Sequence, residues 1–474
     1  MMRVSRRSVL KLGASGLTMA TLGALGSTWV PTRLAHAAPS SLPSIQFDIG
    51  DYIGPVEAIN GIDFRFGPVF TSFITARLKR RPDEEDQQVL NDALAMIENR
   101  FAFSPEGVFT FISYGLPYFR RLPRPLVAQH MLRLTATPNR FALEEAVPSP
   151  TDVSRTNRQI EKVRFNVPVA IERNDVLVTL RSDTLAPLLD VYSWLKGVDW
   201  LNGQFVPAPA FRGLFEFTSS RLMFAQRGLP RKVAEAHSLP YAGHVPPDSP
   251  MWMGFADQHV TGAGPASIVA FQGNEEARFT DTKAGDYFFD GAIQHLSHLI
   301  LDLAEWYDET YSERVQYMFR SNPIPSIGKA DQFVDGGGPT FLAANFQGRE
   351  DALHNATAAD TFEGKRRMGH LAALHRSSRT SKGTPLHIRM DGPGFDTMDV
   401  PDGSTQPKLH FTVFVPTANF FAAMRRNQAA TDLVERDGVE EEDNGLERFL
   451  TVTRRQNFLV PPRIHRAFPL VELT

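Results

Sequence analysis

The chain has 474 residues, of which 42% are hydrophobic and 22% charged, as is usual for a globular protein. It contains no cysteine, which excludes disulfides, iron–sulfur clusters, thiolate nucleophiles and covalent haem attachment through a C-x-x-C-H motif. The net charge is −3, and it becomes −8 without the five basic residues of positions 1–37, so we expect no nucleic-acid-binding face.

The first 37 residues have the pattern of a twin-arginine signal peptide. The string SRRSVLK at 5–11 precedes an apolar, Gly/Ala-rich stretch to residue 30, and AHA at 35–37 is an A-x-A cleavage site. An uncleaved membrane anchor is the alternative, because the stretch is almost long enough to span a bilayer. The small residues and the cleavage site favour removal. We therefore expect export to the periplasm or the extracellular space, with no membrane span in the mature chain.

The first half of the mature chain has the pattern of a mixed α+β domain. Pro82 and Asp83 precede apolar residues at helical spacing from Val89 to Ile97, which predicts a helix. Strands are expected at 106–114, 127–137 and 175–182. The apolar spacing of 185–196 predicts a helix that ends at Gly197. These elements predict an antiparallel sheet with packed helices.

The second half repeats this plan loosely. Strands are expected at 266–272, 287–299, 409–415 and 456–460, and helices at 302–318 and 419–427. DGPG at 391–394 predicts a turn, and 335–363 and the acidic run 435–442 predict loops. Pro, Gly and Ser cluster between 231 and 250. We therefore place a domain boundary there, giving domains of residues 38–245 and 246–474.

Short motifs in the second half resemble those of the dye-decolourising peroxidases, a haem peroxidase family that is often exported by the twin-arginine route. GFAD at 254–257 resembles the family's Gly-x-x-Asp-Gly motif, with Gln258 in place of the second glycine. His370 follows where the family has its proximal histidine, and Arg389 where it has its distal arginine. FLVPP at 458–462 matches the closing motif Phe-x-Val-Pro-Pro. The resemblance covers roughly residues 100–465.

This resemblance implies an α+β fold of two ferredoxin-like domains, each an antiparallel sheet with packed helices, of the dimeric α+β barrel type. It implies one non-covalent haem b per chain, with His370 as the iron ligand and Gly254, Phe255 and Arg389 in the cofactor site. Asp257 and Arg389 would be catalytic. Asp257 would move a proton between the oxygens of hydrogen peroxide, and Arg389 would stabilise the leaving oxygen. The reaction would be peroxide-dependent oxidation of an organic donor.

Other histidines compete for a role. His375 and His387 are rival iron ligands. His295 and His298 are three residues apart, so on a strand they point to opposite faces and share no metal, whereas on a helix they could chelate one.

Two alternative functions stay open. One is a haem-binding or iron-handling protein on the same scaffold. The other is a haem-free interaction protein, which the glycine-to-glutamine change at Gln258 favours. Within the peroxidase interpretation, Trp306 and Tyr307 are the kind of residues that carry electrons to a bulky donor at the surface. A homo-oligomer is compatible with every one of these interpretations.

Overall fold

The computed structural model describes residues 42–53, 57–59, 62–64, 67–146, 162, 164–255, 263–273, 279–318, 360–362, 365–367, 369–370, 385–429, 438 and 445–474. The signal peptide, Asp257, His375 and most of both predicted loops lie outside these residues. Within the described part of the chain, no helix is both long enough and apolar enough to cross a membrane.

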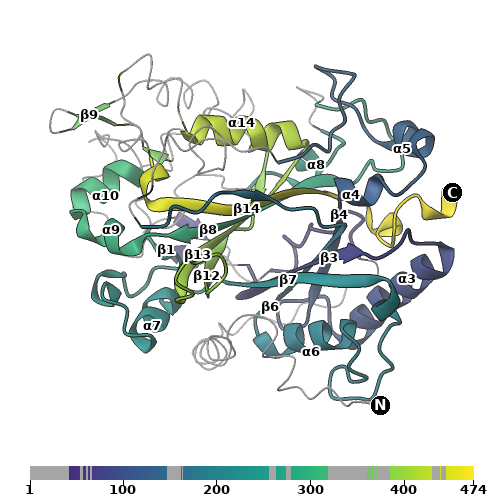
Figure 1. Ribbon diagram of the computed structural model, residues 1–474, viewed down its shortest axis with the longest axis horizontal. Helices are drawn as coiled ribbons and strands as arrows, with labels where there is room; N and C mark the ends of the chain where they lie inside the picture. The colour runs from purple at the N-terminus through teal and green to yellow at the C-terminus, as the bar shows by residue number, and fades with distance from the viewer. Residues whose placement is uncertain are drawn as a thin grey trace.

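A ten-stranded sheet runs through both halves of the chain (Figure 1). Its ladders are antiparallel except for one parallel pairing between β14 and β5. The α+β class and the antiparallel sheet that the sequence predicts are therefore confirmed. In spatial order the strands are β11 (Ile388–Arg389), β13 (Gln406–Val415), β8 (Ala292–Leu301), β14 (Leu450–Val460), β4 (Phe109–Gly115), β6 (Val176–Ser182), β3 (Phe70–Leu78) and β7 (Phe215–Phe224), while β12 (Gly392–Asp396) pairs with β13 and β5 (Ala170–Ile171) with β14.

The two halves of the chain join where β4 meets β14. Phe458 pairs with Gly115 and Leu459 with Tyr114. The C-terminal tail then contacts the first half of the chain, where the Tyr114 hydroxyl donates to the carbonyl of Arg466 at 2.6 Å. The predicted boundary after residue 245 falls between β7 and β8, and the division into two domains stays a prediction.

Helix α3 (Glu84–Arg100) shows how local sequence determines an element. The Asp83 carboxylate accepts from the Asp86 backbone N–H, and the Asp86 carboxylate accepts from the Asp83 N–H, both at 3.0 Å. This capping box satisfies two backbone donors at the start of the helix. Leu90, Leu94 and Ile97 are buried at helical spacing, and each such burial contributes about 1.5–3 kcal/mol. The predicted helix is confirmed.

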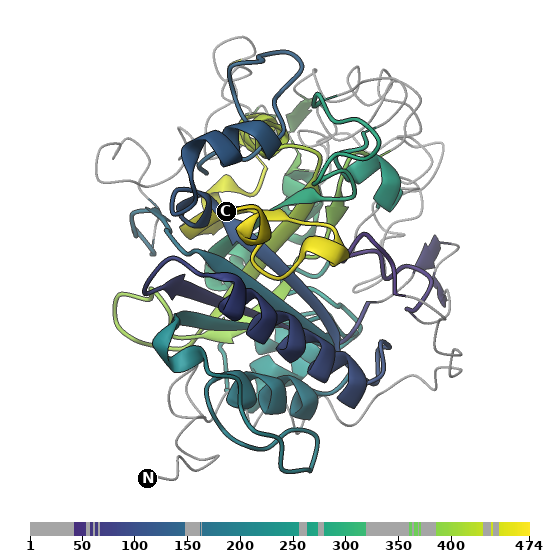
Figure 2. The ribbon, with the colours of Figure 1, turned by 90° about the vertical axis from the view of Figure 1, so that its right-hand side faces the viewer.

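Helices cover both faces of the sheet. α3 and α6 (Leu185–Leu195) run side by side below it, and α14 (Ala418–Ala429) lies above it (Figures 1 and 2). The other helices are α4 (Leu116–Phe119), α5 (Arg124–His130), α7 (Leu229–Ala236), α8 (Ala266–Val269), α9 (Leu303–Asp308) and α10 (Tyr311–Met318). Short 3₁₀ turns are η1 (Phe211–Gly213), η2 (Ala242–His244), η5 (Glu447–Phe449), η6 (Arg463–His465) and η7 (Val471–Leu473), and two antiparallel hairpins are β1–β2 (Glu57–Ile59, Ile62–Phe64) and β9–β10 (Asp360–Phe362, Lys365–Arg367).

Three expectations from the sequence were wrong. The strand expected at 127–137 begins inside α5, because Pro125 occupies the first helical turn, where its missing N–H costs no hydrogen bond. The strand expected at 266–272 begins as α8, since a short apolar run does not distinguish a strand from a buried helical turn. The turn expected at 391–394 is largely part of β12. Pro393 is tolerated there because β12 pairs with β13 alone among the described strands.

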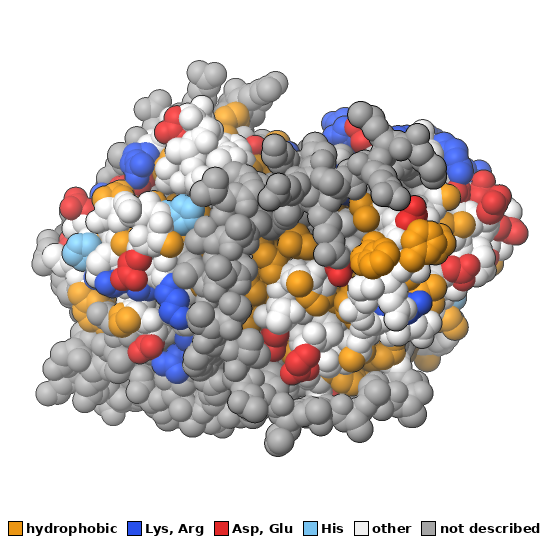
Figure 3. Space-filling view, turned by 90° about the horizontal axis from the view of Figure 1, so that it is seen from below, with side chains coloured by type: hydrophobic (Ala, Val, Ile, Leu, Met, Phe, Trp, Pro, Cys, Tyr) orange, Lys and Arg blue, Asp and Glu red, His pale blue; other side chains and the backbone are white. Residues whose placement is uncertain are grey.

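Basic and acidic side chains are interspersed on the face seen from below in Figure 3. No continuous basic surface is visible among the coloured residues of this view.

Candidate functional site

The segment before the predicted Gly-x-x-Asp motif is hydrogen-bonded to helix α9. The Trp306 indole Nε1 donates to the carbonyl of Met253 at 3.0 Å, and the Tyr307 hydroxyl donates to the carbonyl of Trp252 at 2.6 Å. Trp306 is 0% and Tyr307 7% exposed. A role for these two side chains in carrying electrons to a donor stays a prediction. They are buried, and they position the backbone of 252–253.

Gly254 and Phe255 continue this contact. Gly254 has φ +90°, and a Cβ at this position would lie 3.0 Å from Pro246 and 3.5 Å from the Tyr307 hydroxyl. A glycine is therefore required by both the backbone and the space. Phe255 is buried, with its ring centroid 6.4 Å from that of Trp306. Asp257, two residues further along, lies outside the described residues.

His370 lies beside the turn that leads into η5. A Cβ at Gly445 would be 3.2 Å from the His370 Cα, and Gly445 has φ +55°. The ring of Phe449, at the end of η5, lies 5.0 Å from that of Trp306. Trp306 therefore makes edge-on ring contacts with both Phe255 and Phe449. The structure brings the Gly-x-x-Asp segment and the turn next to His370 against the same indole.

Arg389 lies on β11, opposite Val413, with its side chain 17% exposed and its Nε 3.8 Å from the Asp391 carboxylate. Val413 in turn pairs with His295, near the start of β8. The turn η5 leads into Leu450, the first residue of β14, and Leu450 pairs with Leu301, the last residue of β8. Arg389 and the turn next to His370 therefore attach to opposite ends of β8.

The residues described before and after Asp257 lie at different places on the sheet. The residues described before it end at Phe255, against Trp306. After it, Gly264 donates its backbone N–H to the carbonyl of His387 at 2.8 Å, two residues before Arg389. The described residues on the two sides of Asp257 therefore lie near the α9 end of the sheet and near β11.

A second group of histidines was not predicted from the sequence. His298 on β8 and His410 on β13 are direct cross-strand partners, and Asp396 ends the neighbouring strand β12. The Asp396 carboxylate is 3.6 Å from His298 Nε2 and 3.7 Å from His410 Nε2. Both histidine side chains are 0% exposed. One ligand atom from each of the three residues lies within 4.8 Å of the others, which is a geometry that can hold a metal ion.

Charged groups surround this cluster. Lys408 Nζ donates to the carbonyl of Met398 at 2.6 Å and lies 3.7 Å from the Asp396 carboxylate. Burial lowers the pKa of Lys408 to about 8. Arg454 makes two 2.7 Å hydrogen bonds to Asp399. Burial opposes ionisation of Asp399, but hydrogen bonds from His298 and Arg454 still hold its pKa below the ordinary value. The cluster therefore lies in a charged, mostly buried environment.

His295, three residues before His298, faces the other side of the sheet, as the spacing on a strand predicts. Its Nδ1 is 2.6 Å from the Asn457 amide oxygen, and its Nε2 is 2.5 Å from the Ser297 hydroxyl. The amide oxygen only accepts, so Nδ1 carries the proton and Nε2 accepts from Ser297. Its ring stacks on Phe421 of α14 at 3.3 Å between centroids. His295 is therefore a neutral core histidine whose two ring nitrogens are both hydrogen-bonded.

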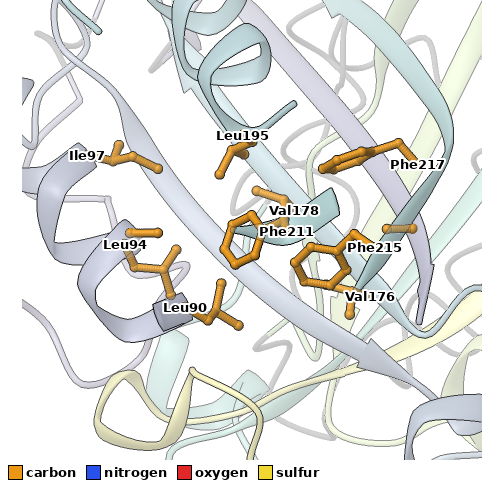
Figure 4. Close-up of a pocket in the computed structure, with 11 residues that line it drawn as sticks. Leu90, Leu94, Ile97, Val176, Val178, Leu195, Phe211, Phe215 and Phe217 are labelled. Carbon is orange, nitrogen blue, oxygen red and sulfur yellow. The ribbon is translucent and has the colours of Figure 1, made fainter. Parts of the chain in front are cut away.

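A cavity between α3, α6 and the sheet has a different character (Figure 4). Leu90, Leu94 and Ile97 point into it from α3, and Phe215 and Phe217 from β7. Every side chain that lines it is apolar. Substrate and cofactor pockets contain a few polar groups that fix the ligand's orientation. We therefore interpret this space as a packing defect in the core.

A family model described as "Family of unknown function (DUF7405)" matches residues 68–462. A search of curated proteins found no match. Solved dye-decolourising peroxidase structures, of the family that the sequence motifs resemble, are similar to this chain.

Three of these structures illustrate the similarity. One is a dye-decolourising peroxidase from Bacteroides thetaiotaomicron, with 13% identity over 87% of this chain and 97% of that chain and a TM-score of 0.47. Another is the encapsulated DyP-type peroxidase from Mycobacterium smegmatis, with 15% identity, 85% and 96% coverage and a TM-score of 0.47. The third is DtpA from Streptomyces lividans, solved as an oxyferrous complex, with 14% identity, 87% and 92% coverage and a TM-score of 0.49.

Proposed function

The chain belongs to the family of unknown function (DUF7405), and we propose that it is an exported haem peroxidase that oxidises an organic donor with hydrogen peroxide. The observation that carries this proposal is the contact of Trp306 with both Phe255 and Phe449. Through it, the segment leading to Asp257 and the turn next to His370 share one neighbour. Asp257 and His370, which are far apart in the sequence, would then border the same site.

The side chains in this region fit haem. The chain has no cysteine, so an imidazole is the strong axial donor that remains for a ferric haem. His370 is half-buried, and Gly445 packs against its backbone without a side chain. We propose one non-covalent haem b per chain with His370 as its ligand and Gly254 and Phe255 at its border. When bound, haem supplies the iron that takes oxidising equivalents from peroxide.

Asp257 and Arg389 would act on the peroxide itself. Asp257 would accept a proton from one peroxide oxygen and return it to the other, which is work that a positioned carboxylate can do. Arg389 would stabilise the charge on the leaving oxygen. Its side chain is 17% exposed, and its Nε lies 3.8 Å from the Asp391 carboxylate. A mostly buried guanidinium acts more strongly on a developing charge than one in water.

Export is the second part of the proposal. The SRRSVLK string and the AHA site support transport by the twin-arginine route to the periplasm or beyond. A mature chain without cysteine needs no disulfide chemistry at that location.

The test is the absorption spectrum of the protein purified after native export, from cells supplemented with a haem precursor. We expect a Soret band that shifts when peroxide is added. His370→Ala should lose most of the haem, whereas His387→Ala, which removes a rival ligand, should keep it. Arg389→Ala should keep haem and slow the reaction with peroxide by roughly 100- to 1000-fold. Full haem and an unchanged Soret band in His370→Ala would contradict the ligand assignment.

Two outcomes would point to the alternative functions. Full haem loading without a reaction with peroxide would favour a haem-binding or iron-handling protein. A protein that has no Soret band and takes up no added haem would favour a haem-free interaction protein, as the Gln258 substitution suggests.

A further inference from the structure

The proton position on His298 follows from its contact with Thr453. The Thr453 hydroxyl donates its single proton to the carbonyl of His298 at 3.2 Å. At 2.7 Å from His298 Nδ1, the same oxygen must then accept, so Nδ1 carries a proton. In the neutral ring, Nε2 has a lone pair, and it lies 3.6 Å from the Asp396 carboxylate. While the ring is neutral, two acceptors therefore face each other in a buried space.

His410 adds a second imidazole to this space. Neither of its ring nitrogens, nor His298 Nε2, has a hydrogen-bond partner among the described residues. Buried polar atoms without partners are rare, because each costs about 1–3 kcal/mol. A Cβ on Gly394 would come within 2.4 Å of His410 Nε2, so the glycine keeps room for this ring. Something other than the described side chains is therefore needed to satisfy these nitrogens.

A metal ion would take one nitrogen from each histidine and one oxygen from Asp396. Zinc binds histidine nitrogen and carboxylate oxygen at about 2.0–2.2 Å, which places two ligands of a tetrahedral site about 3.3–3.6 Å apart. Asp396 Oδ1 lies 3.6 Å from His298 Nε2, and the other carboxylate oxygen, Oδ2, lies 3.7 Å from His410 Nε2. Both distances are longer than an N–H···O hydrogen bond of about 2.7–3.2 Å and close to the spacing across a metal.

We propose that His298, His410 and Asp396 form a binding site for a divalent transition-metal ion, with Zn²⁺ as the best match to the ligand set. Three protein ligands leave one position of a tetrahedral ion open, as in zinc sites that bind water or a substrate. This site lies on β8, β12 and β13 and is independent of the haem proposal.

The groups around the ligands support this assignment. The Thr453 hydroxyl orients His298 through Nδ1, which is the usual arrangement for a metal-binding histidine. Asp399 lies 3.5 Å from the same nitrogen and is held by Arg454. The Asp396 side chain is 11% exposed, so the cluster is not sealed from solvent.

Lys408 is the competing cation. Its Nζ lies 3.7 Å from Asp396 and compensates the carboxylate charge when no ion is bound. The alternative to a metal site is therefore a buried Lys408–Asp396 ion pair with two neutral histidines beside it. The two arrangements differ in one measurable property, which is specific binding of a metal.

The full-length protein is freed of metal with a chelator, dialysed, and titrated with Zn²⁺ and with Co²⁺. We expect one equivalent of Zn²⁺ to bind, and Co²⁺ to give the intense visible ligand-field bands of a tetrahedral site. His410→Gln and Asp396→Asn should each weaken Zn²⁺ binding by at least about 100-fold. His295→Gln changes another buried histidine, on the same strand as His298, and should bind Zn²⁺ as the wild type does. Haem content, measured in parallel, should be the same in all of these proteins.

Three results would overturn the assignment. One is a wild-type protein that binds no Zn²⁺ more tightly than His410→Gln does. Another is equal loss of binding in His295→Gln. If the ligand variants fail to fold, by circular dichroism, then the wild-type Co²⁺ spectrum decides, and the absence of tetrahedral bands would rule the site out. None of these results depends on whether the protein binds haem.

Discussion

The ion pair between Arg425 in α14 and Glu447 in η5 should hold the turn beside His370 in place. Two guanidinium nitrogens donate to the two carboxylate oxygens, at 2.8 and 2.7 Å. The two side chains are only 7% and 6% exposed. Removing one partner of a buried pair leaves the other charge uncompensated and costs about 3–5 kcal/mol. Glu447→Gln keeps one acceptor oxygen, so we expect it to lower the free energy of unfolding by about 3 kcal/mol.

The double variant Arg425→Met/Glu447→Leu is the control, because it removes both charges and leaves apolar side chains of similar size. Its free energy of unfolding should lie within about 1 kcal/mol of the wild type. Urea unfolding followed by circular dichroism gives the midpoint and the slope for each protein. A loss below about 1 kcal/mol in Glu447→Gln would refute the reasoning. So would a double variant that is as unstable as the single one.

Four further predictions concern single side chains. Gly254→Ala forces a side chain into φ +90° and against Pro246, so it should cost about 1–3 kcal/mol in urea unfolding, and an unchanged midpoint would contradict the geometry. Val176→Ile adds a methyl group toward the apolar cavity and should raise stability by about 0.8 kcal/mol, whereas a lower melting temperature would mean that the cavity cannot accept it. Burial lowers the pKa of His295 well below 6.5 in the folded protein. As the pH falls, His295 therefore binds a proton in the unfolded chain before it does so in the folded protein. The contribution of His295 to the free energy of unfolding should therefore be fully present above pH 6.5 and fall by about 1.4 kcal/mol for each pH unit below it. Urea unfolding at several pH values should show that His295→Gln lacks this pH-dependent loss. Lys408→Met removes the competing cation and should tighten Zn²⁺ binding at least about tenfold in a chelator competition assay, whereas weaker binding would argue against competition for Asp396.

Elements with local signals could be predicted from the sequence. The helix from Asp83 has its capping residues and its apolar face within one short segment, and β13 alternates without interruption. Strand β12 could not be predicted, because Gly392, Pro393 and Gly394 are usual in turns. These residues form a strand because of a contact with a neighbouring strand, which their own sequence does not reveal. Gly394 leaves room for the ring of His410 on the neighbouring strand.

One candidate site could be recognised from the sequence, and the other only from the folded structure. The resemblance to a known family singled out Gly254, Phe255 and His370, and the structure explains Gly254 through its positive φ and its packing on Tyr307. The pairing of His298 with His410 depends on the register between β8 and β13, which neither segment specifies alone. The alternation in β13 places His410 on one face, but only the folded sheet shows which residue lies opposite.

Strand β8 shows why residue type and spacing do not decide what a histidine does. His295 and His298 are three residues apart on the same strand, and both are completely buried. On one face, Asn457 and Ser297 provide an acceptor and a donor, so His295 needs nothing more. On the other face, Thr453 occupies Nδ1 of His298, and the remaining nitrogen faces a carboxylate. The difference lies in the neighbouring strands, which supply a complete set of hydrogen-bond partners on one face and a set of metal ligands on the other.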